Sequence, residues 1–115
     1  MNVAIVRGRL SSEPRTTDLP SGDVLTSLEV TVPAAGDTPA ASVPVAWFGA
    51  PAAAATWECG QELVVVGRVR RRWFRAGAST QSRTEVVADA VVPTSRKAAV
   101  VKAVASALEA IQAAP

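Results

Sequence analysis

The predicted fold depends on residues 63–75, which have the sequence Leu63-Val64-Val65-Val66-Gly67-Arg68-Val69-Arg70-Arg71-Arg72-Trp73-Phe74-Arg75. β-Branched residues dominate the first half and favour a strand, and a glycine inside a strand is typical of a bulge or a sharp bend. A turn at 76–79 follows, and a second β-rich segment at 83–92 returns the chain to Pro93. These residues therefore predict a long, bent hairpin.

Three segments upstream also have strand character. Residues 2–9 are rich in β-branched side chains, and residues 24–32 alternate between apolar and polar positions, as a half-buried strand does. Residues 43–48 form the third segment, in which Pro44 indicates an edge or a bulge. The Pro-, Gly- and Ala-rich stretch 33–42 predicts a loop.

Two segments predict helices. Residues 50–59 are alanine-rich, with Pro51 in the first turn and Gly60 as a C-cap, which favours a short helix. Residues 95–113 lack Gly and Pro and predict a longer amphipathic helix. We expect its apolar stripe to pack on the barrel or on a neighbouring subunit; the stripe consists of Val101, Val104, Leu108 and Ile111.

The order of these elements predicts an all-β fold with an appended helix. Five short strands with strong bends, and a short helix between the third and fourth, match the OB-fold, a Greek-key barrel. Closure of such a sheet removes its edges and buries its Val-rich face. We expect an OB-fold domain at residues 1–93 and a C-terminal amphipathic helix at 94–115.

Composition excludes several classes of protein. The 115 residues include no histidine and one cysteine, so we expect no structural disulfide, metal, cofactor or enzymatic activity. The N-terminus lacks the apolar core of a signal peptide, and no run approaches the roughly 20 apolar residues of a membrane helix. We expect a cytoplasmic protein that does not bind membranes.

The positive charge is concentrated in one place. Residues 68–75 hold five of the twelve basic residues and no acid, so the rest of the chain carries a net charge of −3. On a strand, Arg70, Arg72 and Phe74 point to one face. Such a face suits single-stranded nucleic acid, because the cations can contact the phosphates while the aromatic ring stacks on a base. The alternative is a solvated basic strand with Trp73 packed in the core.

The remaining aromatic and acidic residues have clearer roles. Alternation places Trp47 inside the barrel and Phe48 outside, where Phe48 is a candidate stacking ring. Trp57, on the alanine-rich segment, is expected to cap the core. Glu85 and Asp89 share a strand face, and we expect them to balance nearby arginines rather than to bind a metal ion.

Taken together, these segments resemble the bacterial single-stranded DNA-binding protein family over residues 2–92. The resemblance is carried by Asn2-Val3, Gly8-Arg9-Leu10, Glu13-Pro14, Ser21-Gly22, Val43-Pro44-Val45-Ala46-Trp47-Phe48-Gly49, Gly60-Gln61-Glu62-Leu63-Val64-Val65-Val66-Gly67-Arg68-Val69 and Thr84-Glu85-Val86-Val87-Ala88. It implies an OB-fold that binds single-stranded DNA without strong sequence preference in replication, recombination or repair. It also implies a homotetramer, with a dimer as the alternative.

The resemblance also implies a set of binding residues. Phe74 and Phe48 match the family's stacking aromatics, and Arg70 and Arg72 match its basic positions on the fourth strand. We expect four further residues to support the contact: Trp73, Arg68, Arg75 and Arg9.

Two departures from the family leave a second function open. Loop 33–42 holds no aromatic residue, which suggests fewer stacking positions, and the chain ends in an Ala-rich helix instead of an acidic tip. We therefore do not expect partner recruitment by the family's usual route. The alternative is an OB-fold protein–protein interaction module in a genome-maintenance assembly.

Overall fold

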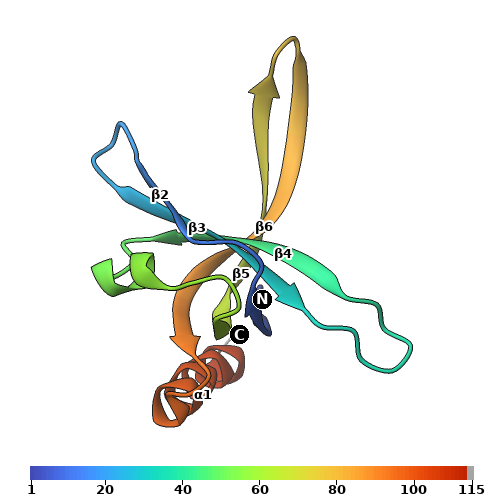
Figure 1. Ribbon diagram of the computed structural model, residues 1–115, viewed down its shortest axis with the longest axis vertical. Coiled ribbons are helices and arrows are strands. Elements are labelled where there is room, and N and C mark those ends of the chain that lie inside the picture. Colours follow the sequence, from blue (N-terminus) through green and yellow to red (C-terminus); the bar gives the residue numbers. More distant parts are fainter. Residues whose placement is uncertain (114–115) are drawn as a thin grey trace.

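The computed structural model describes residues 1–113 (Figure 1). Its elements are β1 (Ala4–Leu10), β2 (Arg15–Asp18), β3 (Val24–Val32), β4 (Ala41–Phe48), the 3-10 helix η1 (Ala52–Thr56), β5 (Glu62–Ala76), β6 (Ser79–Pro93) and α1 (Lys97–Ala113). The protein is mostly β with one C-terminal helix, as predicted. No helix in this part of the chain is long and apolar enough to cross a membrane.

Strand pairing closes five of the six strands into a ring in the order β1-β5-β6-β4-β3-β1. The β1–β3 pair that completes the ring is short, with Arg9 opposite Thr31 and Leu10 opposite Val30. The β4–β6 pair is parallel and the others are antiparallel. Side chains inside the ring form the main core, which includes Leu10, Leu28, Val30, Val45, Trp47, Leu63, Val65 and Val86.

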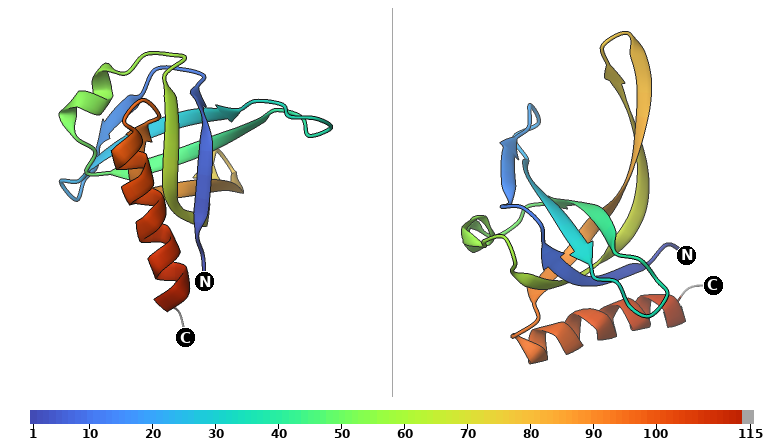
Figure 2. Two further views of the ribbon diagram at one scale, coloured as in Figure 1. Left: turned by 90° about the horizontal axis from the view of Figure 1, so that it is seen from below. Right: turned by 45° about the vertical axis from the view of Figure 1, so that its right-hand side comes forward.

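The first half of β5 is apolar on both faces because it is covered on both sides. Leu63 and Val65 point into the core of the ring. Val64 and Val66 point outward, where they pack against α1 in a second apolar cluster. Figure 2 shows α1 lying along the outside of the barrel beside β5. This double burial explains why residues 63–66 lack the usual polar alternation.

Gly67 marks the bulge that the sequence predicts. The β5–β6 register shifts between Val66 and Gly67, and a Cβ built on Gly67 would overlap the carbonyl oxygen of Val87. Beyond this point the two strands leave the ring: residues 70–85 pair only with each other around the turn at Gly77. The resulting hairpin projects from the barrel on the side opposite α1 (Figure 1).

Two elements differ from the sequence predictions. Residues 15–18, for which the sequence predicts no element, form the exposed strand β2, which pairs only with β3 and extends the sheet outside the ring. The helix predicted at 50–59 is shorter and of 3-10 type. It ends at Thr56 because Trp57 is extended, and this brings the Trp57 ring onto Trp47 with centroids 5.9 Å apart.

The predicted apolar stripe of α1 is largely not the face that packs on the barrel. Val101, Leu108 and Ile111 are exposed, and of the predicted stripe only Val104 contacts the barrel. The packed face consists of Val100, Ala103, Val104 and Ala107. Small residues sit there because the helix lies close to the sheet. The predicted helical residues 114–115 lie outside the described residues.

We predict that Gly67→Ala destabilises the protein by about 3 kcal/mol, because the new methyl group must displace the backbone of β6. Gly77→Ala is the matched control. A Cβ at Gly77 would meet open space, so the only cost there is the strain of alanine at a φ of 63°, which destabilises the fold by roughly 1–2 kcal/mol. Chemical denaturation followed by tryptophan fluorescence measures both variants, and a Gly67→Ala loss no larger than that of the control would contradict this account.

Candidate nucleic-acid interface

The projecting hairpin has two faces with different chemistry. Cross-strand pairing places Arg70, Arg72 and Phe74 on one face, opposite Glu85, Arg83 and Gln81 of β6. Arg71, Trp73 and Arg75 lie on the other face, opposite Thr84, Ser82 and Thr80. We call this second set the Trp73 face.

The first face continues onto the outer surfaces of β4 and β3 and forms a groove there of about 840 Å³. We call it the outer groove. Its lining includes Arg15, Leu25, Ser27, Glu29, Phe48, Arg70, Arg72, Arg83 and Glu85. The sheet thus brings together Phe48, Arg70 and Arg72, three residues that the sequence predicts as binding residues.

The aromatic rings of this face lie beside guanidinium groups. The Arg70 guanidinium carbon is 5.8 Å from the centroid of the Phe48 ring, and that of Arg72 is 5.4 Å from the Phe74 ring. Phe48 is 39% exposed while its neighbour Trp47 is 8% exposed, which confirms the predicted orientation of the pair. Two cation–aromatic pairs therefore lie along one surface, with one face of each ring covered.

A buried carboxylate holds the two arginines of the outer groove. Glu85 is only 5% exposed and accepts hydrogen bonds from Arg70 at 2.6 Å and from Arg72 at 3.3 Å. Arg83 donates to Glu29 at 2.6 Å in the same groove. These contacts confirm that Glu85 balances nearby arginines. They also leave the groove nearly neutral, with four arginines and three glutamates in its lining.

The Trp73 face has no such balance. The Arg71 guanidinium carbon lies 5.2 Å from the centroid of the Trp73 ring, and neither Arg71 nor Arg75 has an acidic partner within residues 1–113. Trp73 is 64% exposed, so the alternative that placed it in the core is wrong. Alternation along β5 places Trp73 on the same side of the strand as the core residues Leu63 and Val65, but at residue 73 the hairpin has already left the barrel. The least neutralised cations of the hairpin are therefore here.

The two remaining predicted residues lie outside both surfaces. Arg68, at the base of the hairpin, donates to Asp89 at 3.1 Å and lines a different groove beside α1. Arg9 is exposed on β1, opposite Glu62 and Thr31, and does not line the outer groove. The sheet therefore does not bring all eight predicted residues together.

Sequence reasoning missed Arg83, Arg15 and Arg71. The signal for Arg83 is the hairpin register, because a turn centred on residues 77–78 places it opposite Arg72. Arg15 has no comparable signal, because its position depends on the unpredicted strand β2. Arg71 lies within the basic run, but parity separates it from Arg70 and Arg72.

Comparison with known proteins adds no assignment. No protein-family model matches the chain, and no curated protein matches it significantly. Within residues 1–113, no three metal-ligating side chains gather in a group. The candidate interface is therefore inferred from the geometry alone: its arginines, its aromatic rings and the exposed surface of its strands.

We predict that iodide quenches the fluorescence of Trp73 more effectively than neutral acrylamide does, because Arg71 and Arg75 concentrate anions at this exposed ring. Trp47 and Trp57 stack at the core and serve as the internal comparison. In Trp73→Phe the ratio of iodide to acrylamide quenching constants should fall, and an unchanged ratio would show that the Trp73 face carries no excess positive potential.

Proposed function

We propose that this protein binds single-stranded DNA without strong sequence preference, through the outer groove and the Trp73 face of the hairpin. The observation that carries the proposal is the gathering of Phe48 with Arg70 and of Phe74 with Arg72 on one sheet surface. Arginine suits phosphate, and an exposed ring suits any base, because every base has a π-face.

The strand arrangement supports the same proposal. A closed ring in the order β1-β5-β6-β4-β3, with β2 outside it and η1 between β4 and β5, supports the interpretation as an OB-fold. OB-folds use the surface of their second and third strands for oligonucleotides, and these correspond here to β3 and β4. The outer groove lies on that surface.

The contact would combine electrostatic capture with stacking. Arg71 and Arg75 on the Trp73 face would attract the backbone first, because no carboxylate neutralises them within residues 1–113. Bases would then stack on the open faces of Phe48 and Phe74. Arg70 and Arg72 would contribute fully only if phosphates compete with Glu85 for their guanidinium groups.

The family resemblance also suggests a cellular process, a compartment and an oligomeric state. The protein would act in replication, recombination or repair in the cytoplasm, as a homo-oligomer, with a homotetramer as the form that the resemblance implies. The other candidate function, an OB-fold module for protein–protein interaction, is supported by the exposed apolar residues of α1. It predicts partner capture that depends on residues 95–115 and no binding of oligonucleotides.

We predict that oligo-dT quenches the tryptophan fluorescence of the protein, with an affinity that falls steeply as salt rises. Phe74→Leu should weaken binding by roughly 1–3 kcal/mol, because leucine keeps apolar volume but loses the flat ring. Phe74→Trp should retain or improve the affinity. The matched control is Arg9→Ala, outside the outer groove, which should change the affinity little.

Absence of salt-sensitive binding at micromolar protein would refute the proposed function. If binding occurs but Phe74→Leu leaves the affinity unchanged, the function stands and the assignment of Phe74 as a stacking ring is wrong.

We predict that Glu85→Gln strengthens binding at low salt, because it releases Arg70 and Arg72 for phosphate. If both arginines then reach the backbone, the slope of log K against log salt should steepen by about 1.4, at roughly 0.7 per phosphate for single strands. Glu62→Gln makes the same change of charge and releases Arg7, which lies outside the outer groove. An equal change of slope in both variants would mean that the salt dependence of binding reflects the net charge of the protein and not the release of Arg70 and Arg72.

A further inference from the structure

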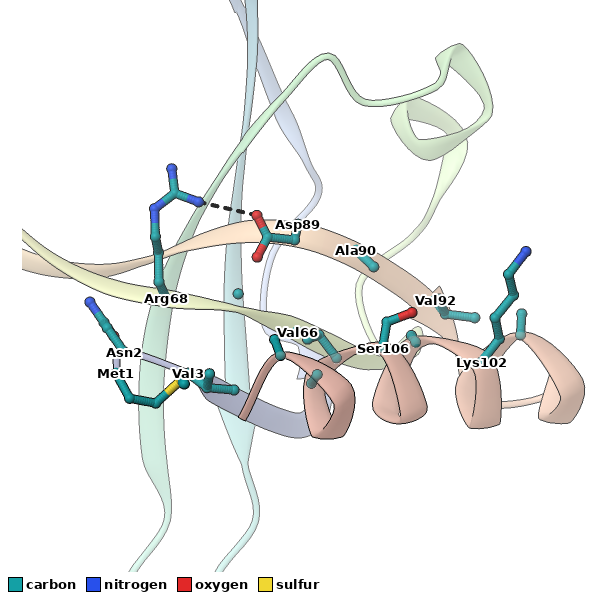
Figure 3. Close-up of a pocket in the computed structure, with 15 residues that line it drawn as sticks. Met1, Asn2, Val3, Val66, Arg68, Asp89, Ala90, Val92, Lys102 and Ser106 are labelled. Carbon is teal, nitrogen blue, oxygen red and sulfur yellow. Dashed lines mark hydrogen bonds and ion pairs between the residues drawn. The ribbon is translucent and has the colours of Figure 1, made fainter. Parts of the chain in front are cut away.

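Helix α1 presents apolar side chains that the barrel does not cover. Val101, Leu108 and Ile111 are 68%, 52% and 45% exposed. They lie on one flank of the helix, because they are separated by seven and three residues. The opposite flank, with Lys102 and Ser106, lines the groove between α1 and β6 that Figure 3 shows.

The spacing of this flank is that of a coiled-coil seam. Val101, Val104, Leu108 and Ile111 occupy alternate a and d positions of a heptad, and Val104 forms the border with the packed face. The flanking e and g positions are uncharged: Val100, Ala105, Ala107 and Gln112. This pattern fits a second helix, and no like charges at the seam oppose pairing of a helix with its own copy.

We propose that α1 pairs with α1 of a second copy of this chain in an antiparallel, two-fold symmetric contact. The charges favour this direction. Lys97 lies four residues before Val101 on the same side of the helix, at the end of the seam, and no acid occupies the first turn of α1. Antiparallel pairing places Lys97 near the negative C-terminal end of the partner's helix dipole. Parallel pairing would place Lys97 beside Lys97 of the other copy.

The pairing surface extends onto β1. Ile5 is directly opposite Val66 in the β1–β5 pair, so it shares the sheet face that α1 covers, and it is 48% exposed. A two-heptad seam is smaller than the roughly 800 Å² per partner of a standard stable interface. We therefore expect this contact to be reversible and to form in the micromolar range.

The contact leaves the candidate nucleic-acid interface free. α1 and the projecting hairpin lie on opposite sides of the barrel (Figure 1), so both hairpins of the dimer would remain open to solvent. This inference does not depend on the proposed function. It assigns an interaction surface to a helix face that the barrel leaves uncovered.

The test is sedimentation velocity of the full chain at increasing concentration. The sedimentation coefficient of the wild-type protein should rise with concentration as copies pair through α1. Leu108→Glu should abolish this rise, while its circular dichroism spectrum stays that of the folded chain. The matched control is Ala113→Glu, which places the same charge at an exposed position on the other side of the helix. Oligo-dT titration of Leu108→Glu reports separately on the proposed function.

Cysteine cross-linking tests the direction of the pair. In a Cys59→Ser background, a mixture of Val101→Cys and Ile111→Cys should form a mixed disulfide, because antiparallel pairing sets these positions side by side. Val101→Cys alone should not cross-link. A wild-type chain that stays monomeric, an assembly whose mass Leu108→Glu leaves unchanged, or self-cross-linking of Val101→Cys would each overturn the proposal.

Discussion

The close approach of β5 and β6 at Gly67 is the constraint on which the rest of the structure depends. The backbone carbonyl of Val87 occupies the space that any side chain at residue 67 would need. The bulge there shifts the register between the two strands, which lets β5 close the ring with β1 before it and form the projecting hairpin after it. Barrel and hairpin therefore depend on one residue without a side chain.

The same strand changes its surroundings twice along its length. Before Gly67 it is buried on both faces, by the core and by α1, and valine suits both. After Gly67 it has lost both covers, and the chain there has arginine and aromatic residues. Glu85 then divides the hairpin electrostatically: its buried carboxylate neutralises the face toward β4, and the Trp73 face keeps its charge. A protein with a net charge of +2 thus concentrates positive potential at one end.

Much of this could be predicted from the sequence, and the failures have physical causes. Alternation correctly oriented Trp47 and Phe48, and Gly67 correctly marked the bulge, because both are local effects of strand geometry. The exposure of Trp73 could not be predicted, because it depends on how far the hairpin extends beyond the core. Arg9 and Arg68 were grouped with the site by charge and resemblance, but only strand register decides which surface each one faces.

The helix shows a different limit of sequence reasoning. A heptad stripe of Val101, Val104, Leu108 and Ile111 predicts burial, but a helix that lies close to a sheet packs better through small residues. Ala103 and Ala107 therefore face the barrel, and the larger side chains turn outward. In the isolated chain these outward side chains leave apolar area in water and so contribute no hydrophobic stabilisation. A helix with two apolar flanks can pack on its own barrel through one flank and on a second surface through the other.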